Sequence, residues 1–352
     1  MEKKRALKVL GILIAIELAV VALFVWFFDP FYQYHEPFMG LQAVLNDRDN
    51  QMPGSLRNFT YDSVLLGSSV AENFDSSYLD EVYDCHTIKA IRASGSVADL
   101  LYYMDMAREN REIKRVFWCL DIFALLSSPE VTLYEDNIPR YLHTTTVVDD
   151  IPYLYNKEII LEKTPIMLAS SQMGMNTGGH AYDWSEDKEF SAERAMEAYE
   201  KPEEILPPID YSQDIPTIQK NVEMVLQEIN AHPDVEYIVF FPPYSMLWWD
   251  CGHINGFGEE YLYVVEQILT GLVDCENVTV YYYQAEQDII CNLDYYMDMV
   301  HYSPEINQYM LESIAADKGR VTTENLTEVL THLRETYEYI ITEGIYQYYE
   351  KY

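Results

Sequence analysis

The chain has 352 residues, and its 58 Asp and Glu side chains outnumber 23 Lys and Arg side chains, which gives a formal net charge of −35. This length allows one large domain or two modest ones with a sizeable core. A surface with such an excess of acidic groups repels nucleic acid and anionic lipid, so the composition argues against a nucleic-acid-binding role, and an acidic exported protein accounts for it.

The N-terminus combines basic residues with an apolar run. Four Lys and Arg side chains lie within the first eight residues, and residues 9–28 contain a single charge, Glu17. Such a run is long enough to span a bilayer as a helix, and the basic flank predicts a cytoplasmic N-terminus. Because the run ends in Trp, Phe and Asp without a small-residue cleavage site, we expect an uncleaved anchor rather than a signal peptide. The rest of the chain would then face outward from the cell membrane.

Residues 29–60 are rich in Pro, Asn and Asp, which predicts an irregular collar between the membrane and the first strand. Beyond it, short apolar runs alternate with segments of helical periodicity. The predicted strands are residues 63–66, 87–92, 115–120, 236–241 and 278–283, and the predicted helices are 76–83, 97–108, 215–231, 256–272 and 304–316. This alternation predicts a mostly parallel five-stranded sheet with right-handed crossovers, and hence an α/β domain over residues 61–320.

Two further segments complete the predicted organisation. Residues 125–213 form a long insertion with a Gly-rich, aromatic stretch, which we expect to act as a flap over the catalytic edge of the sheet. Residues 321–352 are predicted to be helical, because apolar residues recur along one face, and to pack on the domain or on a partner.

The first predicted strand ends in Gly67-Ser68-Ser69, and a helix can begin at Ser69. A strand that turns sharply into a helix leaves a hydroxyl at the carboxyl edge of the sheet, beside the free N–H groups of the first helical turn. That arrangement suits a nucleophilic serine with part of an oxyanion site. The same pattern is also typical of an ordinary helix N-cap.

A second motif, Asp298-Met-Val-His301, lies after the last predicted strand and just before a helix start at Ser303-Pro304. An Asp three residues before a His can hold the imidazole tautomer while the His accepts a serine proton. Asp294 is another candidate for the orienting acid, but it lies seven residues from His301.

A Ser after the first strand together with a late Asp-x-x-His block resembles the SGNH (GDSL-like) hydrolase family, and in particular its membrane-anchored bacterial members of the DltD-like and alginate O-acetylation-like types. The resemblance implies a three-layer α/β/α fold, with Ser69 as nucleophile, His301 as base and Asp298 as its orienting acid. It also implies acyl-ester hydrolysis or transfer on a cell-envelope glycopolymer, a membrane-bound acyltransferase as partner, and no cofactor.

The family pattern adds a Gly after the second strand and an Asn after the third, which complete the oxyanion hole. Gly95 matches the Gly, but Asp121 stands where the Asn is expected, and a carboxylate accepts hydrogen bonds unless it is protonated. Ser68 likewise replaces the Asp of the family's Gly-Asp-Ser block, and Tyr244, after a Pro-Pro pair, is placed to line the pocket. These departures leave an alternative open, a non-catalytic scaffold or docking subunit with the same fold.

Five cysteines form no Cys-x-x-Cys motif, and their number is odd, so at least one has no partner within the chain. Neither a disulfide framework nor a metal site is predicted from this pattern.

Overall fold

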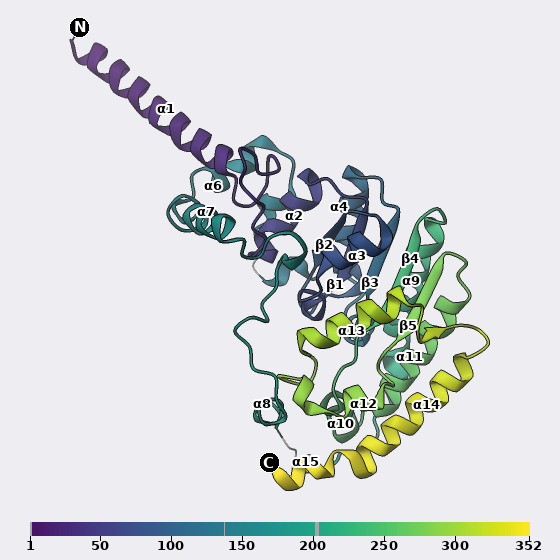
Figure 1. Ribbon diagram of the computed structural model, residues 1–352. Coiled ribbons are helices and arrows are strands. Elements are labelled where there is room, and N and C mark those ends of the chain that lie inside the picture. Colours follow the sequence, from purple (N-terminus) through teal and green to yellow (C-terminus); the bar gives the residue numbers. More distant parts are fainter. Residues whose placement is uncertain (1, 137, 201–203) are drawn as a thin grey trace. The chain divides into compact units, whose positions relative to one another are not determined.

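In the computed structural model, which describes residues 2–136, 138–200 and 204–352, the chain folds into two units (Figure 1). The first unit consists of the residues up to 59 and residues 134–181, and the second consists of residues 60–133 and 182–352. The second unit holds the sheet and every residue that the sequence predicts for the site.

The second unit is built on a six-stranded sheet in the order β2-β1-β3-β4-β5-β6. The strands are β1 (Ser63–Gly67), β2 (Thr87–Ile91), β3 (Arg115–Cys119), β4 (Glu236–Phe241), β5 (Val278–Tyr282) and β6 (Arg320–Val321). The first five strands pair in parallel, and their order reverses between β1 and β3. In open α/β sheets such a point of reversal leaves a crevice at the carboxyl ends of the two strands, where ligands bind.

The prediction of an α/β fold with a mostly parallel sheet is confirmed, but the predicted number of five strands is wrong. The sixth strand, β6, pairs antiparallel with β5 through Val321 opposite Val280 and Arg320 opposite Tyr281. It follows directly on Gly319, whose φ is +75°. A strand of two residues is too short to produce an alternating pattern, so its pairing depends on the position of β5 and not on local sequence.

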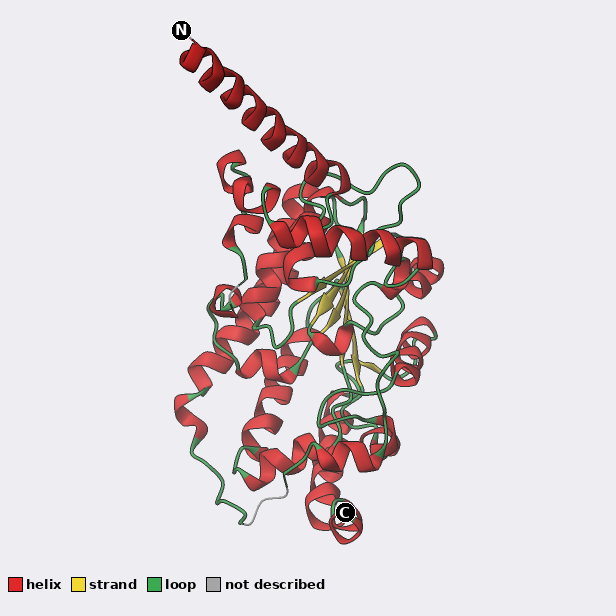
Figure 2. Cartoon of the chain, turned by 90° about the vertical axis from the view of Figure 1, so that its left-hand side faces the viewer, coloured by secondary structure: helices red, strands yellow, loops and turns green. Residues whose placement is uncertain are grey.

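Helices lie on both sides of the strands (Figure 2). The α-helices of the second unit are α3 (Ser76–Tyr83), α4 (Val97–Asn110), α5 (Ile122–Leu126), α8 (Ala192–Glu197), α9 (Ile215–Ala231), α10 (Met246–Ile254), α11 (Gly258–Val273), α12 (Gln287–Ile290), α13 (Pro304–Ala315), α14 (Leu326–Tyr339) and α15 (Tyr346–Lys351). Helix α9 contacts α4, α5 and α11, while α3 contacts α13. The five predicted helices are all present, with ends shifted by two residues or fewer.

The C-terminal segment is helical, as predicted, and it divides into two helices. Helix α14 is followed by a π-helical turn, Ile340–Gly344, and then by α15. Leu333 and Tyr337 of α14 are buried, and α14 packs against α11, with Arg334 paired to Glu259 at 3.1 Å. The segment therefore packs on the body of the second unit.

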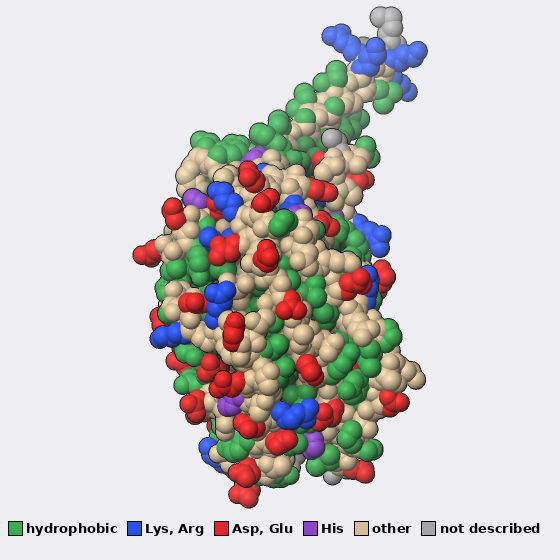
Figure 3. Space-filling model, turned by 90° about the vertical axis from the view of Figure 1, so that its right-hand side faces the viewer, with side chains coloured by type: hydrophobic (Ala, Val, Ile, Leu, Met, Phe, Trp, Pro, Cys, Tyr) green, Lys and Arg blue, Asp and Glu red, His purple; other side chains and the backbone are tan. Residues whose placement is uncertain are grey.

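The first unit contains α1 (Glu2–Phe28), α2 (Arg48–Asn58), α6 (Ile151–Leu154) and α7 (Thr164–Met173). Over Lys3–Phe28 the mean hydropathy reaches 2.7 and only 6% of the most apolar window is buried, so α1 is long and apolar enough to cross a membrane. Lys and Arg side chains gather at its N-terminal tip, whereas Asp and Glu are scattered over much of the rest of the face in Figure 3.

Helix α2 lies within the predicted irregular collar, so that part of the prediction is wrong. The segment is helical even though Pro53 is inside it, because its face is buried: Met52 and Leu56 are fully enclosed. Gly54 is required here, since a Cβ atom at this position would lie 2.1 Å from the carbonyl oxygen of Phe31. Tertiary packing has overridden the helix-breaking tendency of the local sequence.

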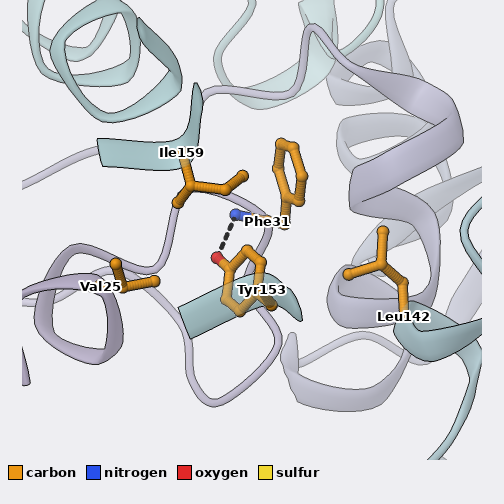
Figure 4. Packing of buried hydrophobic residues seen from close by; sticks show 5 residues of the cluster. All are labelled: Val25, Phe31, Leu142, Tyr153 and Ile159. Carbon is orange, nitrogen blue, oxygen red and sulfur yellow. Dashed lines mark hydrogen bonds between the residues drawn. The ribbon is translucent and has the colours of Figure 1, made fainter. Parts of the chain in front are cut away.

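The C-terminal end of α1 is packed into the first unit through a buried apolar cluster (Figure 4). The cluster consists of Val25, Phe31, Leu142, Tyr153 and Ile159, which come from the end of α1, the residues just after it and residues 134–181. The Phe31 and Tyr153 rings stack at 5.6 Å, and the backbone N–H of Phe31 donates to the Tyr153 hydroxyl at 3.1 Å.

Candidate active site

Strand β1 ends in a tight turn that presents Ser69. A single turn of 3₁₀ helix, Ser69–Ala71, follows Ser68 directly, and α3 begins only at Ser76. Gly67 makes the turn possible, because a Cβ atom there would lie 2.8 Å from the Ala71 Cβ and 3.0 Å from the Cys119 carbonyl oxygen. The Ser69 side chain is half-buried at the carboxyl end of the sheet, as predicted.

Ser69, His301 and Asp298 form a hydrogen-bonded chain. The Ser69 Oγ lies 2.9 Å from His301 Nε2, and His301 Nδ1 lies 2.7 Å from Asp298 Oδ2. The other carboxylate oxygen of Asp298 accepts the backbone N–H groups of Val300 and His301, both at 2.8 Å. Burial by itself would raise the pKa of the Asp298 carboxyl, but the contacts with His301 and the N–H group of Val300 lower it overall. Asp298 is therefore ionised at neutral pH and fixes both the tautomer and the orientation of the imidazole.

The loop that carries His301 is fixed from two sides. Tyr296 and Tyr302 form an isolated antiparallel bridge across its base, and the Met299 carbonyl accepts hydrogen bonds from the backbone and the hydroxyl of Ser245. The Tyr302 hydroxyl also donates to the carbonyl of Val70, at 3.1 Å. The two halves of the site, more than two hundred residues apart in sequence, are thus joined directly. Asp294, the other acid considered, instead accepts the N–H group of Ala192.

Trp184 is a site residue that sequence reasoning did not single out. Its ring meets the His301 ring edge-on, with centroids 5.3 Å apart, and its indole N–H donates to the Ser69 carbonyl at 3.4 Å. Its backbone N–H donates to the Asn73 side chain. Trp184 belongs to the predicted insertion, residues 125–213, where the aromatic composition was the only indication of a functional role. Nothing in the local sequence distinguishes Trp184 from the other aromatic residues of that segment.

The donors available for an oxyanion differ from the expected set. Within the described residues the backbone N–H of Ser69, at the start of the 3₁₀ turn, donates to no protein acceptor. The N–H of Gly95, by contrast, donates to the Arg92 carbonyl at 3.0 Å. Gly95 is also packed against Arg92, because a Cβ atom on it would lie 2.6 Å from the Arg92 Cγ. Gly95 thus lies at the predicted strand end, but its N–H group is already engaged.

Asp121, Tyr244 and Ser68 form a buried polar cluster next to Ser69. The Tyr244 hydroxyl donates to Asp121 Oδ1, and the hydroxyl and N–H of Ser68 face the same carboxyl. The other oxygen, Oδ2, is buried without a well-aligned donor among the described residues. Burial raises the pKa of the Asp121 carboxyl, and the contacts with Tyr244, Ser68 and the nearby His301 only partly oppose that rise.

A buried lysine, Lys89, holds the chain just after the 3₁₀ turn Ser69–Ala71. Lys89 of β2 is 2% exposed, and its ammonium nitrogen donates to the Glu72 carbonyl, one residue beyond the 3₁₀ turn, at 2.6 Å. Burial lowers its pKa to about 7, against the attraction of Asp183, Asp75 and Glu72. In the sequence, this residue is only a polar position inside an apolar strand, so its role was not predicted.

The arrangement is suited to nucleophilic acyl transfer. The hydroxyl, the imidazole and the carboxylate are aligned for the proton of Ser69 to move to His301 while Asp298 stabilises the resulting charge. Among the described residues, no group of His, Cys, Asp and Glu side chains is arranged to hold a metal ion, and all five cysteines are free thiols.

Comparison with known proteins gives no independent assignment. No protein-family model matches the sequence, and no curated protein matches it significantly.

Proposed function

We propose that this chain is a membrane-anchored serine enzyme of the SGNH type that hydrolyses or transfers acyl esters on a cell-envelope glycopolymer. The observation that carries the proposal is the hydrogen-bonded chain from Ser69 through His301 to Asp298, with links of 2.9 and 2.7 Å. The position of Ser69 at the carboxyl end of β1, beside the reversal of strand order, supports it as well.

In the first half-reaction, Ser69 Oγ attacks the carbonyl carbon of the ester as its proton moves to His301 Nε2. Asp298 stabilises the imidazolium that forms. The tetrahedral intermediate then breaks its bond to the alcohol oxygen, which takes the proton from His301, and an acyl-Ser69 ester remains. In the second half, water or a sugar hydroxyl attacks the acyl carbon while His301 takes its proton, and Ser69 Oγ recovers that proton when it leaves. No cofactor enters this sequence.

The negative oxygen of each tetrahedral intermediate needs hydrogen-bond donors. The free N–H group of Ser69 supplies one. A protonated Asp121 would supply another from its Oδ2 position, because burial already favours the neutral acid and Tyr244 occupies only Oδ1. Asp121, which stands where the family pattern has Asn, would then have a role compatible with catalysis.

The proposed location of the protein follows from the apolar helix α1. Helix α1 has the length and apolarity of a membrane span, and its basic N-terminal end favours a cytoplasmic N-terminus, which leaves the sheet-containing unit outside the membrane. There it would meet cell-envelope polymers, and a membrane-bound acyltransferase would be its source of acyl groups.

A second candidate function is a non-catalytic scaffold or docking subunit of a cell-envelope modification complex. Two observations favour it: the N–H group of Gly95 is engaged by Arg92, and Asp121 carries a carboxyl where a neutral amide donor would be expected. A scaffold role would account for the fold without requiring the protein to catalyse a reaction.

A fluorophosphonate probe distinguishes the two functions, because it forms a covalent bond only with an activated serine. We expect the full-length protein in detergent to be labelled, and labelling to be lost in Ser69→Ala. Ser127→Ala is the matched control, since the Ser127 hydroxyl only donates to the Phe123 carbonyl, and it should be labelled like the wild type. Absence of labelling in folded wild-type protein, or labelling that persists in Ser69→Ala, would overturn the enzyme proposal and favour the scaffold.

A further inference from the structure

One segment of the first unit, residues 148–166, leaves several apolar side chains exposed. Within residues 148–166, the side chains of Val148, Ile151 and Leu161 are 70%, 54% and 76% exposed, and Ile166 is 45% exposed. They lie on the 3₁₀ turn Val147–Asp150, on α6, on the π-helical turn Ile159–Lys163 and on α7. Four large aliphatic side chains left in water within nineteen residues are more than the single, scattered apolar residues that protein surfaces normally show.

These elements are attached to the last turn of α1. Val25, fully buried, packs with Tyr153 and Ile159 in the cluster of Figure 4. The Tyr153 hydroxyl donates to the Asp29 carboxylate at 2.7 Å and accepts the N–H of Phe31, which fixes α6 to the chain just beyond the apolar helix.

Packing on Val25 sets the depth at which residues 148–166 would lie in the membrane. Val25 lies three residues before the end of α1, which corresponds to about 4–5 Å along the helix axis. If α1 crosses the bilayer, the elements that pack on Val25 lie at the level of its last turn, where interfacial helices bury their apolar side chains about 5–10 Å into the boundary between headgroups and acyl chains.

A further exposed apolar residue lies on another segment that contacts the end of α1. The Phe38 ring contacts the Phe27 ring of α1 edge-on, at 5.0 Å, and the next residue, Met39, is 82% exposed. Exposed apolar side chains therefore occur on two separate segments that contact the last turns of the same helix.

We propose that residues 148–166 form a second membrane contact, in which Val148, Ile151 and Leu161 insert among the lipid acyl chains beside α1. The inference rests on the anchoring by α1 and is independent of the proposed chemistry at Ser69. Such a contact would restrain the first unit at the membrane surface, in place of attachment through one freely rotating helix.

The charges of the segment indicate which lipids it contacts. Residues 148–166 contain four acidic side chains and two lysines, and Lys163 is paired with Asp47 at 2.9 Å. This surface has no excess positive charge to attract anionic headgroups. Insertion therefore depends on apolar contact, and we expect it in vesicles of zwitterionic phosphatidylcholine alone.

The test is photolabelling of the full-length protein in phosphatidylcholine vesicles that contain a lipid with a diazirine in its acyl chain, followed by mass spectrometry of peptides. We expect label on α1 and on residues 148–166. In the triple variant Val148→Ser, Ile151→Ser, Leu161→Ser, label on residues 148–166 should fall to the level of the peptide that contains Val82, while label on α1 is unchanged. Because the three side chains are exposed, these substitutions leave the buried cluster intact.

Val82→Ser is the matched control, because Val82 is 42% exposed on α3 of the other unit and should not affect any labelling. Label confined to α1 in the wild type would overturn the inference and leave the surface for water or for a protein partner. Absence of label from α1 as well would overturn both the anchor and this contact. Neither result depends on reaction of Ser69, which the fluorophosphonate experiment reports separately.

Discussion

Asp121 is the residue whose protonation state matters most to the proposed chemistry. Its carboxyl is 3% exposed and holds Tyr244 through one oxygen, while the other oxygen is buried without a well-aligned donor among the described residues. An ionised carboxylate beside a developing oxyanion would oppose its formation, whereas a neutral acid would donate a hydrogen bond to it. Burial raises the pKa and so favours the neutral acid.

The variant Asp121→Asn tests this assignment. The amide oxygen can still accept the Tyr244 hydroxyl, and the amide N–H group is a donor at every pH. We expect fluorophosphonate labelling of Asp121→Asn to be at least as fast as that of the wild type, and the advantage to grow with pH, up to about 100-fold where the wild-type acid ionises, because one oxyanion donor is worth about 10²–10³ in rate. Labelling rates of the two proteins, compared at each pH at which both stay folded, would check this, and a uniform loss of rate would show that the carboxyl itself is needed.

Lys89 is a buried base whose protonation affects the stability of the fold. In the native state its pKa is lowered to about 7 from its ordinary value of 10.5. Between pH 7 and pH 10.5 the Lys89 amine is protonated in the unfolded chain but neutral in the native state. The free energy of unfolding therefore rises with pH above about 7 and falls again as the pH is lowered toward 7. The residue supports the turn at Ser69 through the Glu72 carbonyl, so the effect reaches the site.

Replacement of Lys89 by Met removes the titrating amine. We expect the rise in the free energy of unfolding between pH 7 and pH 9 to be smaller in Lys89→Met than in the wild type by roughly 2 kcal/mol, since a full proton difference contributes about 1.4 kcal/mol per pH unit. Denaturant titrations at several pH values measure it. Lys114→Met is the control, because the Lys114 side chain is 68% exposed and should keep the wild-type slope. Parallel curves for Lys89→Met and the wild type would contradict the prediction.

At the scale of elements, the site depends on how β1 passes into the 3₁₀ turn. β1 lies between β2 and β3, and its last residue, Gly67, pairs with Ile91 of β2. The carbonyl of Cys119, at the end of β3, lies close to Gly67, and it belongs to backbone that cannot move without disturbing the sheet. A side chain at residue 67 would therefore displace the turn that carries Ser69.

We expect Gly67→Ala to destabilise the protein by about 1–3 kcal/mol, the usual cost of overpacking, and to slow labelling of the molecules that remain folded. Gly271→Ala is a matched control. There the new Cβ would meet the flexible end of Leu226, at 2.6 Å, in a helix where Ala is preferred over Gly by about 1 kcal/mol. Denaturation midpoints and labelling rates of the two variants measure the difference, and equal effects on both would show that the turn is not constrained as described.

At the scale of the whole molecule, the chain forms its first unit from two separated segments. Residues 134–181 return to the N-terminal segment, where Tyr153 binds Asp29 and Arg57 binds the Leu142 carbonyl at 2.8 Å. The sequence predicts an insertion over these residues and a collar before the first strand, but it gives no sign that the two segments fold together. Such pairing depends on side-chain contacts between segments about 100 residues apart, which periodicity does not encode.

The site was predictable where its chemistry depends on local sequence. Ser69 follows an apolar strand, and the spacing of Asp298 and His301 allows one loop to hold both, so the sequence alone identified the three residues that the structure brings together. Trp184 was not identified, because its contact with His301 requires a loop from elsewhere in the chain. For the same reason, the engagement of the Gly95 N–H by Arg92 could not be foreseen.

The sequence by itself determined the features that arise from short-range patterns: the apolar helix α1, the five parallel strands, the helices between them and the residues able to carry the chemistry. Hydrophobic periodicity and turn residues act over a few positions, and these features need nothing more. Only the tertiary structure decided the features that require distant segments to meet: the pairing of β6, helix α2 around Pro53, the burial of Lys89 and Asp121, and the 2.9 Å contact between Ser69 and His301. Burial and long-range hydrogen bonds are properties of the packed chain, and local sequence does not specify them.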